Sequence, residues 1–431
     1  MTRTASLFAA VFGCAAATAV AAPTYIHAGK LIAVPGQAVR GPSTIIVDSG
    51  RIVAVRDGHV APEPGASLVD LKDKTVLPGL IDSHVHLASD RGGEANLLSM
   101  MREEPQMNAL EAQWNGIKTL RAGFTTVRNL GDEGATLALR EAIKRGWVQG
   151  PRIVDAASSI STTGGHMDGR GSLNDDLIAH LPAPENLCDS AESCRRTVRR
   201  QIDRGADVIK FATTGGVNSG TGLATRMVEE EARALVQTAH AYGRKVAVHA
   251  HGADGIKLAL RAGADSIEHG TVMDDEILRL MKQGGTYYVP TLSTVNGYLE
   301  RLGKDPNAYA PDVKKQIDWR IGITGQSLAK AYPAGVKIAF GTDAGVSKHG
   351  RNADEFELLV KYGMPPVEAL KAATVNAADL LGLASEIGTV EAGKSADIIA
   401  VAGDPLTDVR TLKTVDFVMA RGEVITLPQK R

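Results

Sequence analysis

The sequence predicts a parallel (β/α)8 barrel that carries a small β-sandwich built from both chain ends. Between residues 74 and 385, eight short β-rich runs alternate with amphipathic stretches, and about 300 residues are enough for such a barrel with insertions. Residues 23–73 and 386–431 instead hold short alternating strands broken at Gly, Asp and Pro. Neither end segment can bury a sheet face alone, so we expect the two to form one domain beside the barrel.

The eight β-rich runs are the expected barrel strands. Helical patterns lie between them, such as Met227–Tyr242, Ile256–Ala262 and Asp274–Lys282, in which apolar residues recur three or four apart. A doubly wound open sheet is the competing architecture, but no Gly-rich phosphate loop follows the first run. The expected strands are Thr75–His84, Phe124–Leu130, Arg152–Ala157, Asp207–Thr213, Lys245–His251, Asp265–Gly270, Thr286–Leu292 and Lys337–Asp343.

Composition and charge exclude several classes of protein. The 431 residues are 44% hydrophobic and 23% charged, which is typical of a soluble protein with a buried core. The 48 Lys and Arg residues are balanced by 49 Asp and Glu, so no charge excess attracts nucleic acid or an anionic membrane. Aromatic residues make up only 4% of the chain. We therefore expect neither a nucleic-acid partner nor a membrane span in the mature protein.

Residues 1–22 have the layout of a secretory signal peptide. Arg3 precedes an interrupted apolar stretch too short to span a membrane as a mature helix, and small residues precede a cleavage site after Ala21. We therefore expect an exported protein, periplasmic or secreted. A buried N-terminal helix is disfavoured because the stretch has no polar face, and a lipoprotein attached at Cys14 because the apolar run continues past that residue.

Cleavage would leave two cysteines, Cys188 and Cys194. Two cysteines so close together in an exported chain are candidates for a disulfide, because an oxidising compartment allows the bond to persist. A metal site made from this pair is less favoured, since zinc would need further Cys or His nearby. Two free thiols are the alternative.

Titratable residues gather where the expected barrel strands end. In a strand, alternate side chains share a face, so the two histidines of the motif DSHVH point together into the barrel mouth. Catalytic residues of such barrels lie at the carboxyl ends of several strands. We therefore expect six side chains to converge on one spot: His84, His86, Lys210, His249, His269 and Asp343.

These six residues predict a binuclear metal site. Four imidazoles and a carboxylate are enough ligands for two divalent ions, with Zn²⁺ the most favoured. A buried ammonium would be repelled by the ions, whereas a neutral lysine amine can add CO₂, and the carbamate can bridge ions roughly 3.5–4 Å apart. We expect His84, His86 and Asp343 to hold one ion and the other two histidines the second, with N6-carboxylated Lys210 as the bridge. A lone histidine would more often be a core residue, but six such residues at strand ends favour the metal site.

The motifs, taken in order, resemble those of the amidohydrolase superfamily. LPGLIDSHVHL, Lys210, His249, SIEHG and GTDAG follow one another, and the terminal segments HAGKLIAV and IGTVEAGKSADIIAVAGDPL resemble the family's sandwich strands. The resemblance covers nearly the whole mature chain and implies a distorted (β/α)8 barrel with the ligands named above. The lysine in VIKFATTGG is similar to that of the binuclear branch, whereas a mononuclear deaminase would not need it.

Within that branch, the chain resembles imidazolonepropionase-like Xaa-Pro dipeptidases and ochratoxin-hydrolysing amidohydrolases. The resemblance rests on FTTVRNLG, TTGGHMDG, VIKFATTGGVNS, VAVHAHG and SIEHGT. It implies hydrolysis of an amide bond next to a C-terminal amino acid, in an Xaa-Pro-type dipeptide or an N-acyl amino acid, including ochratoxin A-like amides. It also implies a homo-oligomer, commonly an octamer.

The expected reaction uses a metal-bridging hydroxide. Asp343 would take its proton and pass it to the departing amine, and His251, which faces the same mouth as His249, would donate to the carbonyl oxygen. His166, in a glycine-rich loop, is a substrate contact implied by similar family loops, and Tyr288, at the end of the seventh strand, is a weaker one. The substrate carboxylate has three candidates that the sequence does not distinguish: Arg128, Arg170 and Lys348.

Two other functions stay open at this point. The same binuclear site could serve a lactonase or a cyclic-amide hydrolase, which an assay of N-acyl amino acids against lactones and hydantoins would separate. The chain could also be a non-enzymatic periplasmic metal-binding protein.

Overall fold

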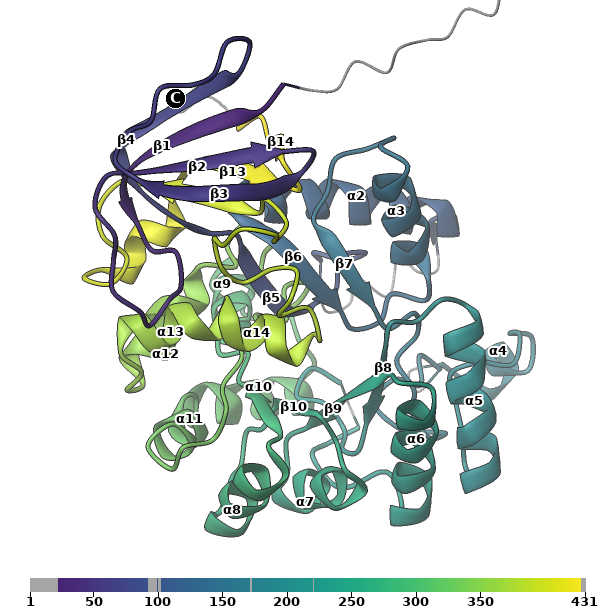
Figure 1. The fold of residues 1–431 in the computed structure, drawn as a ribbon. Coiled ribbons are helices and arrows are strands. Elements are labelled where there is room, and N and C mark those ends of the chain that lie inside the picture. The colour runs from purple at the N-terminus through teal and green to yellow at the C-terminus, as the bar shows by residue number, and fades with distance from the viewer. Residues whose placement is uncertain (1–21, 92–98, 100–101, 171–172, 220, 428–431) are drawn as a thin grey trace, which may run out of the picture.

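The computed structural model describes residues 22–91, 99, 102–170, 173–219 and 221–427. Apart from Ala22, the expected signal peptide lies outside the described residues. Figure 1 shows the first and last strands of the chain together at one end of the molecule, with the barrel strands and their helices beside them. None of the helices in the described ranges is long and apolar enough to cross a membrane.

A seven-stranded sheet joins the two ends of the chain in the order β14-β13-β12-β4-β1-β2-β3. In its centre, β4 pairs in parallel with β1 and antiparallel with β12, so both chain ends share one hydrogen-bonded ladder. Ile26, Ile45 and Ile398 pack together in its apolar core. This arrangement confirms the expected β-unit from both ends. Its strands are β1 (Thr24–Leu31), β2 (Ser43–Asp48), β3 (Arg51–Asp57), β4 (Ser67–Pro78), β12 (Ile398–Val401), β13 (Val415–Ala420) and β14 (Glu423–Val424).

Two parallel sheets form the barrel wall. One has the order β5-β6-β7 and the other the order β11-β10-β9-β8. Isolated parallel bridges close the remaining gaps: Ile160 with Phe211, Tyr288 with Ile338, and Val85 with Ala344. Parallel pairing therefore runs around the ring, which confirms the (β/α)8 barrel. The strands are β5 (Leu80–Val85), β6 (Phe124–Asn129), β7 (Arg152–Asp155), β8 (Val208–Ala212), β9 (Lys245–Ala250), β10 (Ser266–His269) and β11 (Tyr287–Val289).

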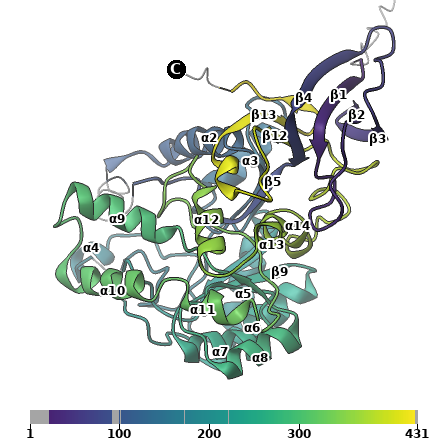
Figure 2. The same ribbon diagram turned by 90° about the vertical axis from the view of Figure 1, so that its left-hand side faces the viewer.

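Helices follow the barrel strands, and α8 shows how one of them is capped at both ends. Asp274 accepts a hydrogen bond from the backbone of Ile277 at the start of α8, and Gly285 ends that helix with φ +66°. In Figure 2, α9 and α10 stand side by side on the left, away from the sheet of both chain ends. The helices are α2 (Pro105–Arg121), α3 (Ala135–Lys144), α4 (Asp175–Ile178), α5 (Ala191–Asp203), α6 (Glu229–Ala241), α7 (Ala253–Ala262), α8 (Asp275–Gly284), α9 (Thr294–Lys304), α10 (Pro311–Gly322), α11 (Gln326–Ala331), α12 (Asp354–Lys361), α13 (Pro366–Ala372), α14 (Val375–Leu380) and the 3-10 turn η1 (Val409–Lys413).

Two expected strands differ from the structure. The run Thr75–His84 is split at Gly79: its first part pairs with β12 in the end sheet, and β5 begins at Leu80. A Cβ on Gly79 would lie 2.2 Å from Thr125 Oγ1, so the chain passes closely there and only glycine fits. The expected domain boundary at residue 74 thus falls inside β4. The run Lys337–Asp343 forms single bridges rather than a regular strand.

Cys188 and Cys194 form a disulfide, with an S–S distance of 2.08 Å. Both residues are buried and pack in the main apolar core, and Cys194 lies in the first turn of α5. The bond ties the loop after β7 to the helix that leads to the strand of Lys210.

We expect alkylation in denaturant to modify Cys188 and Cys194 only after reduction, as read by mass spectrometry of their peptide. The bond closes a loop between residues six apart in sequence and restricts the unfolded chain, so replacing both cysteines by Ser should lower the free energy of unfolding by about 2 kcal/mol. Alkylation of both sulfurs without reductant would contradict the disulfide.

An ion pair lies inside the barrel between β6 and β10. Arg128 Nη2 donates to Glu268 Oε1 over 2.8 Å, both side chains are at most 2% exposed, and Arg128 Nε donates to the Ser83 carbonyl oxygen. The second oxygen of Glu268 accepts a hydrogen bond of 2.8 Å from His84 Nδ1. Burial alone would raise the pKa of Glu268, but Arg128 and His84 outweigh it and lower the pKa to about 2. The carboxylate therefore stays ionised and holds both partners.

We expect Glu268→Gln to lower the free energy of unfolding by about 3–5 kcal/mol, because it leaves the Arg128 guanidinium buried without a counter-charge. Urea denaturation followed by circular dichroism measures this loss. Glu141→Gln, which breaks the exposed pair between Glu141 and Arg145, is the matched control and should leave the midpoint unchanged. An equal effect of the two substitutions would contradict the structural role of the buried pair.

Candidate metal centre

The barrel mouth contains one cavity of about 820 Å³. Parallel strands end at the same face of a barrel, so residues distant in sequence reach this space together. All six expected ligand residues line it, as do the two histidines expected to contact substrate. These eight residues are His84, His86, His166, Lys210, His249, His251, His269 and Asp343.

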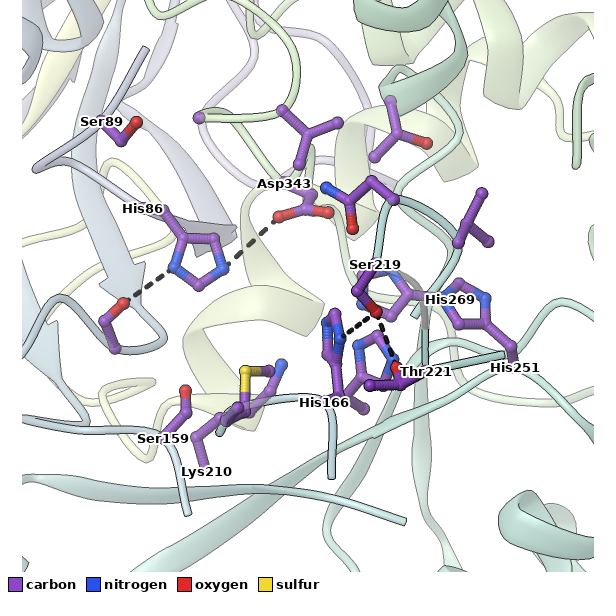
Figure 3. A pocket seen from close by; sticks show the side chains of 18 of the residues that line it. His86, Ser89, Ser159, His166, Lys210, Ser219, Thr221, His251, His269 and Asp343 are labelled. Atoms are coloured by element: carbon purple, nitrogen blue, oxygen red, sulfur yellow. Dashed lines mark hydrogen bonds and ion pairs between the residues drawn. The ribbon is translucent and has the colours of Figure 1, made fainter. Parts of the chain in front are cut away.

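His84 and His86 face the Asp343 carboxylate from one side of the cavity. The Nε2 atoms of both rings lie 3.5 Å from Asp343 Oδ1 (Figure 3 shows this contact for His86). Their other nitrogens are held in place: His84 Nδ1 donates to Glu268, and His86 Nδ1 donates to the Gly131 carbonyl oxygen over 2.9 Å. A hydrogen bond from Nδ1 leaves the lone pair on Nε2, which is the form that ligates a metal.

Three further histidines face one another on the other side. Their ring centroids lie 4.5–4.8 Å apart, and each offers a nitrogen within 4.8 Å of the others. The Nδ1 atoms of His251 and His269 contact the hydroxyls of Thr271 and Thr291 over 2.7 and 2.8 Å. His269 also belongs to a second such group and so links the two sides. The groups are His249, His251 and His269, and His84, His269 and Asp343.

Backbone geometry places two of these residues. The backbones of His269 and Asp343 are left-handed, with φ of +70° and +56°. Residues other than glycine rarely adopt this conformation. The Asp343 backbone N–H donates to the His84 carbonyl oxygen over 2.7 Å. Just before it, Thr342 is tied through its backbone and hydroxyl to the buried Asp82 carboxylate, which also accepts from Asn352. This network holds the irregular eighth run against β5.

The cavity keeps most of its imidazoles neutral. Burial, helped by nearby cationic groups, lowers the pKa of five histidines: to about 4 for His84 and His166, and well below the usual value for His249, His251 and His269. Burial also disfavours protonated His86, but Asp132 and Asp343 outweigh it and raise the pKa of that ring. Neutral imidazoles have the lone pairs that metal binding needs.

Lys210 tests whether the site fits a metal. It is 1% exposed, and its Nζ has no hydrogen-bond partner among the described residues. Burial lowers the pKa of this amine to about 8, although Glu268 and Asp343 oppose the shift. A buried amine without a partner is costly, and it lies among imidazoles and a carboxylate, the donors that divalent ions of the zinc type prefer (Figure 3). The residues present therefore fit a divalent metal.

Four expected substrate contacts do not line the cavity, because each is engaged elsewhere. Tyr288 is buried behind His269 and donates to that residue's carbonyl oxygen over 3.1 Å. Arg128 is inside the barrel with Glu268, Arg170 pairs with Asp168, and Lys348 donates to the Asp90 carbonyl oxygen. These positions correct the expectations for Tyr288 and for all three cations.

His166 does reach the cavity. Its ring stacks on His249 with centroids 4.2 Å apart, and its Nδ1 contacts Ser219 Oγ over 3.1 Å, which in turn contacts Thr221 Oγ1 over 2.7 Å (Figure 3). A Cβ on Gly216 would lie 2.0 Å from the His166 ring, so the loop after β8 needs glycine at this point.

Sequence reasoning missed Glu268 and Arg320. Alternation counted from the expected ligand His269 turns the adjacent Glu268 to the opposite face, so the local pattern did not place it inside the barrel. In the structure it shares its face with Ser266, whose hydroxyl donates to it. Arg320 lies on α10, and no local pattern indicates that this helix lines the cavity.

Comparisons with known proteins agree with the fold. The family described as the Amidohydrolase family matches residues 75–425. Ochratoxinase from Aspergillus niger is 31% identical over 439 residues, which cover 96% of this chain and 88% of that protein.

Two solved structures are also similar. A Xaa-Pro dipeptidase with methionine bound in the active site has a TM-score of 0.88 and 40% identity, covering 94% of this chain and 100% of that one. A prolidase complexed with N-methylphosphonate-L-proline has a TM-score of 0.85 and 31% identity, with the same coverage. Through its ring of parallel strands, its histidine-rich mouth and these likenesses, the chain belongs to the amidohydrolase family.

Proposed function

We propose that this protein is a binuclear metal-dependent amidohydrolase that cleaves the amide bond next to a C-terminal amino acid. The substrate class is an Xaa-Pro-type dipeptide or an N-acyl amino acid, including ochratoxin A-like amides. The observation that carries the proposal is Lys210 Nζ, which has no hydrogen-bond partner among the described residues and lies among neutral imidazoles and the Asp343 carboxylate. The reaction class is supported by the similar proteins, one named an ochratoxinase and another a Xaa-Pro dipeptidase, since a dipeptidase cleaves a peptide bond.

The six residues would hold two divalent ions, with Zn²⁺ favoured by the nitrogen-rich donor set. His84, His86 and Asp343 would bind one ion and His249 and His269 the other. Lys210, as its carbamate, would supply the anionic bridge. When bound, such ions supply Lewis acidity, which lowers the pKa of water and polarises an amide carbonyl.

Asp343 is placed to move the proton. Its Oδ1 lies between the two Nε2 atoms of the first side of the cavity, at 3.5 Å from each. A carboxylate there can take a proton from the attacking water and hand it to the amide nitrogen, which leaves poorly unless protonated. The left-handed backbone at this residue fixes the carboxylate, so little reorganisation is needed during the transfer.

His251 is placed to hydrogen-bond the substrate carbonyl oxygen. His251 Nδ1 contacts the Thr271 hydroxyl over 2.7 Å. The proposed role requires this hydroxyl to donate, so that the neutral ring carries its proton on Nε2 and can offer it to the cavity. Burial and the charge of Arg320 lower the pKa of His251, which keeps the ring neutral. His166, held by Ser219 and stacked on His249, would form part of the acyl-side wall.

The wild-type enzyme, loaded with zinc, should hydrolyse members of a library of Xaa-Pro dipeptides and N-acyl amino acids, measured by release of the free amino acid. Asp343→Asn should lower kcat/KM by about 10²–10⁴-fold, because the proton transfer is lost. Glu133→Gln changes an exposed carboxylate at the same cavity and serves as the control. Turnover of lactones or hydantoins without amide turnover would favour a lactonase or cyclic-amide hydrolase. No turnover of any substrate would favour a non-enzymatic metal-binding protein.

Lys210→Ala should lose bound metal and activity together, because it removes the bridging group. Metal content by inductively coupled plasma mass spectrometry and activity are measured on the same preparation, and a short carboxylic acid should restore part of both. Lys245→Ala, at the opposite end of a neighbouring barrel strand, is the matched control. Two tightly held metal ions in the Lys210→Ala protein would show that the carbamate bridge is wrong.

A further inference from the structure

Arg320 places a buried guanidinium at the wall of the cavity. The residue lies on α10, is 3% exposed and lines the cavity. Within the described part of the chain, its side chain makes one hydrogen bond, from Nη1 to Thr324 Oγ1 over 3.2 Å, and no carboxylate forms an ion pair with it. Most of the donors of a rigid guanidinium fork therefore remain free to bind a ligand.

A buried cation without an anionic partner is unusual, because no ion pair offsets the free energy lost when the charge is removed from water. The other deeply buried arginine of the barrel, Arg128, has the Glu268 carboxylate at 2.8 Å. Arg226, which also lines the cavity, is exposed and donates to the Thr221 carbonyl oxygen. Among the described residues that line the cavity, Arg320 is thus the arginine that is buried and has no carboxylate partner. This indicates that an anionic ligand supplies the missing counter-charge.

The surroundings of Arg320 indicate which part of a ligand it meets. Arg320 lines the same cavity as His251, the histidine proposed to meet the substrate carbonyl, so the guanidinium and that ring face one enclosed space. The same wall is apolar: Tyr298 and Tyr309 pack with Val217, and Val313 and Val346 adjoin them. A cation next to an apolar surface matches an amino acid whose carboxylate and apolar side chain are bound together.

We propose that Arg320 binds the carboxylate of the substrate's C-terminal amino acid and that the wall from α9 and α10 receives its side chain. The planar guanidinium can bind both oxygens of a carboxylate, which a lysine cannot do in the same geometry. The inference rests on the proposed amide hydrolysis and specifies which substrates are preferred. The leaving amino acid should have a free carboxylate and an apolar side chain.

The test compares N-acetyl-L-methionine with its carboxamide, which differ only in the charge that Arg320 would bind. For the wild-type enzyme, kcat/KM for the acid should exceed that for the carboxamide by about a hundredfold or more, the scale of a buried charge pair. Arg320→Met should reduce this ratio towards one, mainly through KM, and Arg320→Lys should give an intermediate ratio. Arg226→Met is the matched control and should keep the wild-type ratio.

A binding measurement complements the kinetics. L-methionine should raise the melting temperature of the wild-type and Arg226→Met proteins but not that of Arg320→Met, whose metal content and circular dichroism are checked. If Arg320→Met does not fold, the ratio for Arg320→Lys decides: a wild-type ratio overturns the inference. Equal turnover of acid and carboxamide by the wild-type enzyme also overturns it while leaving amide hydrolysis intact. Absence of turnover of every amide tested contradicts the proposed function instead.

Discussion

The site depends on keeping nitrogen lone pairs unprotonated inside a closed barrel mouth. Burial makes the charged forms of five histidines and of Lys210 costly, so their pKa values fall. Charged forms of these side chains would need anionic partners, and carboxylates lie near by: Asp343 and Asp132 line the cavity, and Glu268 lies beneath it. A cavity lined by neutral imidazoles with free lone pairs and by carboxylates is suited to bind cations.

The supporting network is as specific as the cavity itself. Glu268 connects β10 to β6 through Arg128 and to β5 through His84, so one carboxylate aligns three strands. Asp82 does the same for the irregular eighth run, because it binds the backbone and hydroxyl of Thr342 just before Asp343. His84 and Asp343 are therefore oriented by side chains that do not line the cavity, the kind of support that gives a proposed metal site a rigid geometry.

The sequence was informative where function follows strand order and silent where it follows tertiary packing. A strand end can be recognised from local pattern, and parallel strands all end at one face, so Lys210 and His249 could be placed at the mouth from the sequence. The run Thr75–His84 is divided at Gly79, where the Thr125 side chain packs against the backbone. This contact joins segments distant in sequence, so a local pattern could not predict it. Tyr288 was expected at the end of its strand but lies in the middle of β11 and faces the core. Arg320 reaches the cavity from α10, whose orientation no periodicity could reveal.

The ladder between β4 and β12 bears on how the molecule is built. Val76 pairs with Ala400, so the edge of β4 stays open until nearly the whole barrel has been synthesised. Such distant pairing is slow to form and leaves an unpaired strand edge in the nascent chain, a template for wrong association. A nascent chain carries this edge unpaired until its last segment is made, whereas the finished sheet holds the first and last segments together and resists fraying from either end.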